Sequence, residues 1–130
     1  MKKHITVAAA VIIRDGRVFS AKRSDRGELA GTWEFPGGKL EPDELAEQAL
    51  VREIHEELDS TIEILEPLMV VEHEYCTFTI TMHAFLCRLV AGSLTLSEHT
   101  DSRWLALDEL ESVGWAAADI PIMETVKGLL

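Results

Sequence analysis

The sequence predicts a layered α/β (α+β) domain, because segments with the pattern of β-strands are interspersed along the chain with two or three helical segments. The chain has 130 residues, which suits one domain with a substantial core, and we expect residues 1–130 to form that single domain. The expected strands cover 4–13, 17–23, 33–35, 62–72, 76–90 and 102–106. The expected helices cover 42–58, a short segment 108–113, and 120–130.

The first two strands are predicted from apolar runs on either side of a turn. Thr6 interrupts the run over 5–13, and Asp15-Gly16 marks a tight turn. The basic start of the chain imitates a secretion signal, but no convincing cleavage site follows. We therefore expect a strand here, no export signal and a cytoplasmic protein. No apolar stretch is long enough to cross a membrane.

The helix over 42–58 is predicted from its first residues and from its apolar spacing. Pro42 suits the first helical position, and Asp43 and Glu44 suit the positive end of the helix dipole. A stripe of residues spaced three or four apart is expected to be buried: Leu50, Val51, Ile54 and Leu58.

A second face of this helix carries Glu53, Glu56 and Glu57. Like charges three or four residues apart cost a few tenths of a kcal/mol per pair on an exposed helix. A solvated acidic surface is the ordinary interpretation of such a face. The alternative is a divalent cation held by the three carboxylates, next to a glycine turn at Gly37-Gly38 that lets a ligand approach the backbone.

The second half of the chain supplies the remaining elements. In the strand over 76–90, three threonines alternate with the apolar residues Phe78, Ile80 and Met82. Pro121 favours the start of the last helix. The two cysteines, Cys76 and Cys87, are expected to be reduced and packed in the domain.

The charge distribution excludes some ligands. The net charge is −11, and residues 41–59 hold eight acids against one arginine, whereas residues 1–39 hold eight bases against four acids. An acidic protein is a poor partner for polymeric nucleic acid. A small phosphate compound remains compatible, because a metal ion bridges it to acids while a few bases hold its outer oxygens.

The spacing of these residues resembles the Nudix box, which is a glycine, five residues, Glu, seven residues, and Arg-Glu-apolar-x-Glu-Glu-x-Gly-apolar. Here the motif extends from Gly38 through Glu44 to Arg52-Glu53-Ile54-His55-Glu56-Glu57. Residues 33–39, Trp-Glu-Phe-Pro-Gly-Gly-Lys, resemble the MutT-type branch of the family. The sequence departs from the motif at the motif's end, where Asp59 and Ser60 replace the glycine and the apolar residue. We expect Asp59 to form a left-handed helix stop, as the glycine does.

This resemblance implies the Nudix fold, with a mixed β-sheet sandwiched between α-helices. It also implies that Glu53, Glu56 and Glu57 are ligands of Mg²⁺, with Mn²⁺ as a substitute, and that the carbonyl of Gly37 adds a backbone ligand. Arg52 is expected to orient Glu44 or a neighbouring carboxylate. Glu98 is the candidate general base and a further metal ligand, although a plain loop acid is the alternative; His99 is more often a bystander in such a loop.

The resemblance further implies a set of substrate-binding residues. Arg23 is expected to hold a phosphate, and Lys39 to screen charge at the same site. Phe35, within the MutT-type motif, is assigned to substrate binding. Phe78 is equally compatible with stacking on a base and with the core. Asp119 is expected to read the base as an acceptor-only carboxylate, with a helix cap as its alternative role.

The function implied is that of a MutT-type nucleoside triphosphate pyrophosphohydrolase acting on 8-oxo-dGTP, other damaged purines or cytosine nucleotides. A second possibility is hydrolysis of ADP-ribose or dinucleoside polyphosphates, although Tyr75 stands where ADP-ribose members tend to carry proline. A third is a catalytically inactive nucleotide-binding module, which is disfavoured because the box carboxylates are retained. The expected partner is a small nucleotide, without polymeric nucleic acid or membrane, bound by a monomer or homodimer.

Overall fold

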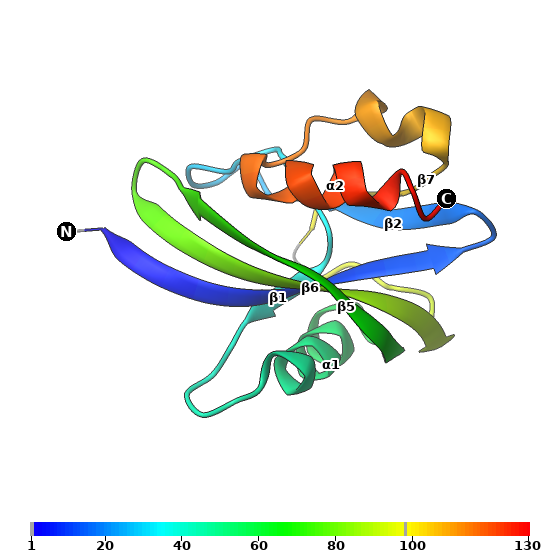
Figure 1. Cartoon of the computed structure of the whole chain (residues 1–130), viewed down its shortest axis with the longest axis horizontal. Helices are drawn as coiled ribbons and strands as arrows, with labels where there is room; N and C mark the ends of the chain where they lie inside the picture. Colours follow the sequence, from blue (N-terminus) through cyan, green and yellow to red (C-terminus); the bar gives the residue numbers. More distant parts are fainter. Residues whose placement is uncertain (1, 98) are drawn as a thin grey trace.

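A computed structural model describes residues 2–97 and 99–130 of the chain. Its strands are β1 (Lys3–Arg14), β2 (Arg17–Lys22), β3 (Trp33–Glu34), β4 (Gly37–Lys39), β5 (Thr61–Glu74), β6 (Phe78–Ala91) and β7 (Asp101–Leu105). The helices are α1 (Ala46–Leu58), α2 (Ile120–Val126) and two 3-10 segments, η1 (Leu107–Ser112) and η2 (Ala117–Asp119). This is the mixed sheet with flanking helices that the sequence predicts (Figure 1).

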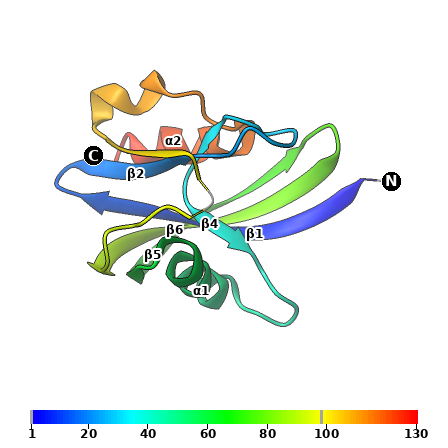
Figure 2. The ribbon, with the colours of Figure 1, turned by 180° about the vertical axis from the view of Figure 1, so that it is seen from behind.

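The long strand β1 joins all parts of the sheet. Along most of its length it pairs parallel with β6, and it pairs antiparallel with β4. Its last residues pair antiparallel with β2, which also pairs with β3 and β7. The order β3-β2-β1-β6-β5 follows, with β4 attached to β1 and β7 attached to β2. Figure 2 shows β4 beside β1. Every strand that positions the candidate site therefore takes its register, directly or through one neighbour, from β1.

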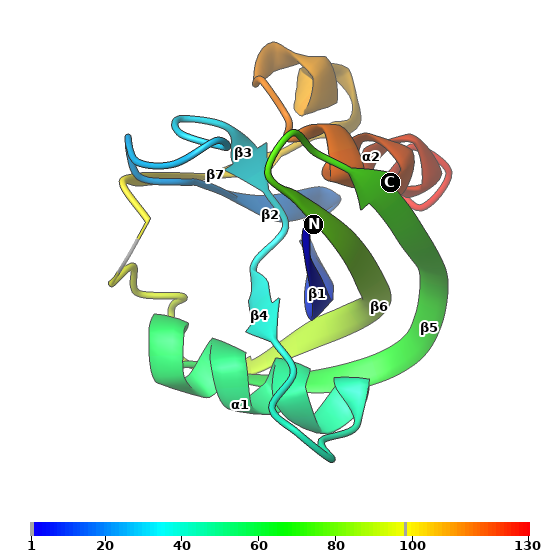
Figure 3. The same ribbon diagram turned by 90° about the vertical axis from the view of Figure 1, so that its left-hand side faces the viewer.

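The two helices cover opposite faces of the β1–β6–β5 part of the sheet (Figure 3). Because side chains alternate along a strand, β1 contributes to both faces. Ala8, Ala10 and Ile12 pack in the core with α1, whereas Ala9 and Val11 pack in the core with α2 and η1. Each helix therefore has its own core, and β1 forms part of both.

The Gly37-Gly38 pair lies in strand β4, not in the turn that we expect from the sequence. A Cβ atom on Gly37 would lie 1.9 Å from the carbonyl oxygen of Ala8, and one on Gly38 would lie 2.3 Å from Cδ of Glu53. The chain needs glycine here because β4 passes close to both β1 and α1. The cause is close packing between distant segments, which a local turn signal does not distinguish.

Helix α1 begins at Ala46, four residues after the predicted start at Pro42. Asp43 has a φ of 65°, in the left-handed region, so the chain still turns at that point. The side chain of Gln48 then accepts the Leu45 N–H at 3.0 Å and satisfies one donor at the helix start. The predicted stripe is wrong at Val51, which is 39% exposed, while Ala49 is buried instead.

The end of α1 matches the expectation for the altered motif. Asp59 adopts the left-handed conformation, with a φ of 48° and a ψ of 44°. The next residue, Ser60, is buried; its hydroxyl accepts the Leu94 N–H and donates to the Leu58 carbonyl. The two replaced residues therefore form a polar helix stop that also fixes the segment after β6.

The last helix is of the predicted type, but its final residue differs from the prediction. Pro121 lies in the first turn of α2, but this helix ends at Val126, before Leu130. Cys87 is buried, which raises the pKa of its thiol to about 12, whereas Cys76 is exposed and the packed state expected for it is wrong. Among the described residues, no helix is long and apolar enough to cross a membrane.

Candidate active site

A cavity of about 390 Å³ lies where β1, β4, β6, α1 and the segment before α2 meet. Eight of the residues predicted to bind metal or substrate line it: Arg23, Phe35, Gly37, Lys39, Glu53, Glu57, Phe78 and Asp119. Glu44, Arg52 and Glu56 do not line it. Glu98 lies outside the described residues. The cavity therefore brings together residues that are separated by up to 96 positions in the sequence, from Arg23 to Asp119.

Two of the glutamates on the acidic face of α1 are paired with an arginine of the same helix, Arg52. Its Nε and Nη2 donate to the two carboxylate oxygens of Glu44 at 2.8 and 2.9 Å, as expected for a residue that orients Glu44. Its Nη1 also donates to Glu53 at 2.9 Å and to Glu56 at 3.2 Å. Arg52 reaches these neighbouring carboxylates because its long side chain folds back along its own helix.

This pairing changes the electrostatics on both sides. The two hydrogen bonds from Arg52 lower the pKa of Glu44 to about 2, and a backbone N–H from Glu41 assists. The same contacts raise the pKa of the Arg52 guanidinium. Glu44 is therefore an ionised anchor for Arg52 throughout the physiological range, and its role in this structure is to hold the arginine.

Two of the three glutamates of α1 that are predicted to bind metal lie at the cavity. Glu53 and Glu57 line the cavity beside the glycines of β4, whereas Glu56 is 58% exposed outside it. Among the residues described by the structure, no three acidic, imidazole or thiol side chains are grouped as a metal cluster. The donor set itself, carboxylates next to a strand carbonyl, is the chemistry that Mg²⁺ and Mn²⁺ prefer.

Residues 35–38 connect the two ends of the site. The N–H of Phe35 donates to Oδ2 of Asp119 at 3.0 Å, and the backbone of Gly38 lies against the side chain of Glu53. This short segment therefore contacts both Asp119 and the Glu53 side chain of α1.

Asp119 is buried, and its environment differs from the acceptor-only carboxylate expected from the sequence. Burial raises its pKa well above the ordinary value, and repulsion from Glu34 adds to this effect. The carboxyl therefore stays protonated to a higher pH than an exposed aspartate. A protonated carboxyl both donates and accepts hydrogen bonds. Its side chain makes no capping bond to α2, so the alternative role as a helix cap is not realised.

A second acid, the partly buried Glu34, holds two basic side chains at the cavity wall. Its Oε1 accepts from Nη1 of Arg23 at 2.9 Å, and its Oε2 lies 2.8 Å from Nε2 of His99. Burial opposes ionisation of Glu34, but the bonds from His99 and Arg23 prevail and its pKa is lowered. Glu34 is therefore a carboxylate that positions Arg23 toward the cavity.

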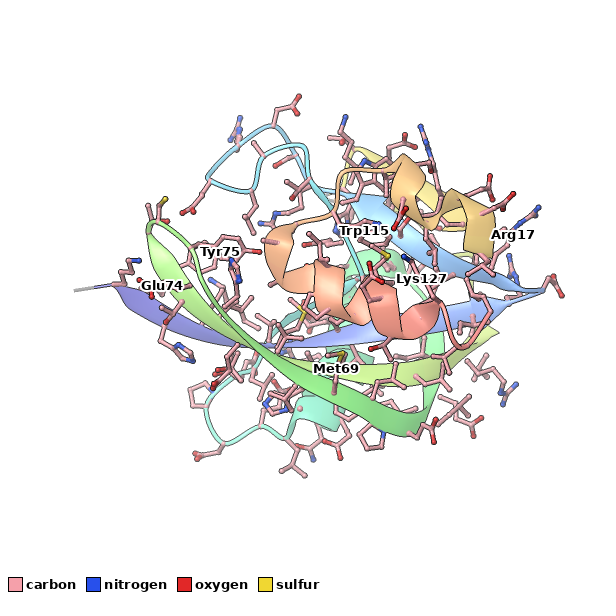
Figure 4. All side chains as sticks on the ribbon, turned by 45° about the horizontal axis from the view of Figure 1, so that its top comes forward. Arg17, Met69, Glu74, Tyr75, Trp115 and Lys127 are labelled. Carbon is pink, nitrogen blue, oxygen red and sulfur yellow. The ribbon has the colours of Figure 1, made fainter. Side chains whose placement is uncertain are left out.

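The tip of the β5–β6 hairpin forms another wall. Tyr75 lies beside the segment that precedes α2 (Figure 4) and its hydroxyl accepts the Ala118 N–H at 2.8 Å. Its ring contacts that of Phe78, with 4.9 Å between centroids. Phe35 stacks on Trp115 at 4.6 Å. These contacts hold the position of Asp119 from two sides.

Sequence reasoning missed three residues of this site: Glu34, Tyr75 and His99. Glu34 stands within the MutT-type motif and Tyr75 is the sole tyrosine of the chain, so both offered a weak signal. His99, expected to be a bystander, is buried: its side chain is 7% exposed. Nothing in the local sequence indicates that burial, because its partner Glu34 is 65 residues away.

The fold and the site agree with a family assignment from comparison. A model of the NUDIX domain matches residues 8–125, and the chain belongs to the Nudix family. Within the family it is a hydrolase of the nucleoside triphosphate diphosphatase type, in the branch that contains the MutT-like and CTP pyrophosphohydrolase-like proteins.

Particular relatives cover most of the chain. CTP pyrophosphohydrolase of Escherichia coli (strain K12) is 39% identical over 127 residues, covering 98% of this chain and 94% of the relative. 8-oxo-dGTP diphosphatase of Proteus vulgaris is 42% identical over 95 residues, covering 72% of this chain and 85% of the relative. The crystal structure of a MutT NUDIX hydrolase from Burkholderia pseudomallei superposes with a TM-score of 0.86 at 32% identity, covering 96% of this chain and 99% of that one. The chain is thus a MutT-like Nudix pyrophosphohydrolase.

Proposed function

We propose that this hydrolase converts a nucleoside triphosphate and water to a nucleoside monophosphate and pyrophosphate, and that its substrates are oxidised or modified nucleotides, such as 8-oxo-dGTP or cytosine nucleotides. Its cellular role is then to clean the nucleotide pool. The observation that carries the proposal is the cavity that joins the glutamates of α1 to a buried carboxyl at Asp119. The names of the relatives support both the purine and the cytosine substrate.

The phosphate end of the site is assigned to α1 and β4. Nudix hydrolases generally use divalent metals, and here Glu53, Glu56, Glu57 and the carbonyl of Gly37 are the residues that would hold Mg²⁺ or Mn²⁺. When the ion is bound, the chemistry that it supplies is neutralisation of phosphate charge and activation of water. Arg23 and Lys39 line the same cavity and bind the outer phosphate oxygens.

The general base is assigned to Glu98. This assignment depends on the resemblance to MutT-type members alone. Arg52 acts as a positioning residue, because it holds Glu53 and Glu56 in place from Glu44.

The base end of the site is assigned to Asp119, with Phe35 and Phe78 as the apolar surfaces beside it. A protonated Asp119 donates to a keto oxygen and accepts from an amine, so that it serves either a guanine-type or a cytosine-type edge. Strict preference for one base is therefore not expected from Asp119 alone. Asp119→Ala should change the ranking of bases more than the rate of hydrolysis of a bare triphosphate.

The discriminating experiment is a panel of nucleotides in the presence of Mg²⁺. We expect kcat/KM for 8-oxo-dGTP, CTP or 5-methyl-dCTP to exceed that for ADP-ribose, with pyrophosphate as the released product. A preference for ADP-ribose, or release of single phosphates, would contradict the proposal. Binding of nucleotides with no turnover would instead identify an inactive binding module.

The catalytic assignment is tested by Glu57→Gln, which keeps the size of the side chain and removes its charge. We expect kcat to fall by about 10²-fold or more, since a ligand for the metal is lost, while the melting temperature changes little. Glu47→Gln, on an exposed part of α1, is the matched control and should retain full activity. Near-normal turnover of Glu57→Gln with Mg²⁺ would remove Glu57 from the mechanism.

A further inference from the structure

The imidazole of His99 has one ring nitrogen that its surroundings leave without a partner. Nε2 lies 2.8 Å from Glu34, but Nδ1 is buried and has no hydrogen-bond partner among the residues that the structure describes. A buried polar atom without a partner costs free energy, and such atoms are rare in folded proteins. A ligand that supplies the missing partner is one reason for a chain to retain such an atom.

The orientation of the ring is fixed by Glu34. The lowered pKa of Glu34 makes it an ionised acceptor, so Nε2 of His99 carries the proton and donates. In a neutral imidazole the other nitrogen is then an acceptor. Rotating the ring by 180° would place carbon against Glu34 and lose this bond. In the neutral ring Nδ1 is therefore an acceptor, and it faces away from Glu34.

Ser97 and Thr100, near His99 in the sequence, are both anchored by hydrogen bonds. The Ser97 hydroxyl donates to the carbonyl of Glu57 at 2.7 Å, at the end of α1. The Thr100 N–H donates to the carbonyl of Lys22 at 3.0 Å, at the end of β2. His99 also lines the same cavity as Arg23 and Asp119. The ring is thus presented to the cavity from a loop held at α1 and at β2.

From this geometry we propose that His99 is a substrate-recognition residue, whose Nδ1 accepts a hydrogen bond from an N–H or O–H donor of the nucleoside. The inference rests on the proposed function, because the donor belongs to the nucleotide in the cavity. The same chemistry is offered by a sugar hydroxyl and by an exocyclic amine of the base. His99 thereby adds a direct contact that complements the base end at Asp119, while its other nitrogen holds Glu34.

Two substitutions separate the two nitrogens. The side-chain amide of His99→Gln reaches as far as Nε2, so it retains the bond to Glu34 and removes the acceptor at Nδ1. The shorter amide of His99→Asn reaches as far as Nδ1 and removes the bond to Glu34. A structural role confined to Glu34 would be lost in His99→Asn and kept in His99→Gln, whereas recognition through Nδ1 would show the opposite pattern.

The test compares nucleotides that differ by one donor. CTP, dCTP and 2′,3′-dideoxy-CTP vary the sugar hydroxyls, and GTP with ITP varies the base amine. For one of these pairs we expect wild-type kcat/KM to favour the nucleotide that has the donor by about three- to tenfold, the range of one net hydrogen bond. His99→Gln should remove that preference, and His99→Asn should keep it while lowering kcat/KM for every nucleotide.

A measurement without turnover provides a second readout. In protein labelled with ¹⁵N at histidine, the Nδ1 resonance of His99 should shift on addition of a non-hydrolysable α,β-methylene nucleotide that carries the donor, and should not shift with its donor-lacking counterpart. The four other histidines are internal controls.

The outcomes distinguish this inference from the proposed function. A wild-type protein that hydrolyses no nucleotide of the panel refutes the proposed function. An active wild type whose His99→Gln variant discriminates as the wild type does, with an unchanged Nδ1 resonance, overturns the role of His99 and indicates a nitrogen that only water reaches.

Discussion

Asp119, a single buried acid, shows how much of this site depends on the environment of individual residues. The same carboxyl is an ordinary acceptor on a surface, and a donor when burial and the nearby charge of Glu34 oppose its ionisation. Arg52 shows the reverse effect, because its contacts hold Glu44 ionised. The functional state of each acid is set by its neighbours and not by its residue type.

The raised pKa of Asp119 predicts that the free energy of unfolding decreases as the pH rises. A group whose pKa is higher in the folded state stabilises the fold below its unfolded pKa, and this contribution is lost as the pH rises through the folded pKa. The amide of Asp119→Asn has no such dependence and still accepts the Phe35 N–H. As the pH rises above about 4, the ordinary pKa of an aspartate, the free energy of unfolding of the wild type should therefore fall relative to that of Asp119→Asn.

Urea unfolding at several pH values measures this difference. Asp25→Asn, at an exposed loop position, is the control and should show no such trend. Parallel stability curves for the wild type and Asp119→Asn would mean that Asp119 ionises as readily in the folded protein as in the unfolded chain.

Gly38 tests the contact between β4 and α1. In Gly38→Ala the new methyl group would lie 2.3 Å from Cδ of Glu53, so the Glu53 side chain must leave its position. We expect kcat/KM to fall at least about tenfold, because a small displacement of a positioned group has a large effect on rate. Gly114→Ala is a matched control, since a Cβ there meets no atom within 4 Å. Equal activity of the two variants would show that the Glu53 position is unimportant.

At the scale of the elements, one carboxylate links two segments of the cavity wall. Glu28, in the loop between β2 and β3, accepts hydrogen bonds from the N–H groups of Cys76 and Thr77 and from the Thr77 hydroxyl. Leu29 and Arg23 on one side of this link, and Tyr75 and Phe78 on the other, line the cavity. Glu28 therefore holds together two segments that the sheet does not connect at this point.

Removing that link should affect substrate binding more than chemistry. In Glu28→Ala we expect KM to rise about three- to tenfold with kcat nearly unchanged, since the lost bonds lie away from α1. Faster hydrogen exchange of the Cys76 and Thr77 amides should accompany the change. These bonds lower the pKa of Glu28, so the link is present above its unfolded pKa and is lost as the pH falls. A fall in kcat with constant KM would contradict this role, and Glu47→Ala serves as the surface control.

Elements with a local signal were predictable from the sequence. The alternation over 76–90 predicts the faces of β6, of which Ile80 and Met82 are buried, and the apolar spacing over 42–58 predicts α1. Strand β4 was not predictable, because Gly37 and Gly38 satisfy a turn pattern locally and are required by the approach of β1 and α1. The link of His99 to Glu34 was equally hidden, because burial of a polar pair depends on contacts across the sheet.

For the whole molecule, the two buried clusters contain none of the glutamates that are predicted to bind metal. The clusters consist of apolar side chains, and α1 contributes Leu50, Ile54 and Leu58 to them. We therefore expect the chain to fold without a bound metal, in contrast to small domains that fold only with metal.

This separation predicts the effect of a chelator. With excess EDTA, turnover should fall below detection, while the far-UV circular dichroism stays the same and the melting temperature changes by no more than about 4 °C, the shift of about 1 kcal/mol. Mg²⁺ added in excess over EDTA should restore activity, and EDTA saturated with Ca²⁺ or Mg²⁺ beforehand is the control. Loss of the dichroism signal with EDTA would mean that the protein needs the bound metal in order to stay folded.

Strand β1 also determines where the chain tolerates a change of length. One additional residue within Val7–Ile12 would turn every later side chain of the strand to the opposite face. Ala10 and Ile12 would then point toward α2, and Val11 toward α1, so small and large residues would exchange places in both cores. Insertions in this strand should therefore be far rarer among related proteins than substitutions of one aliphatic residue by another.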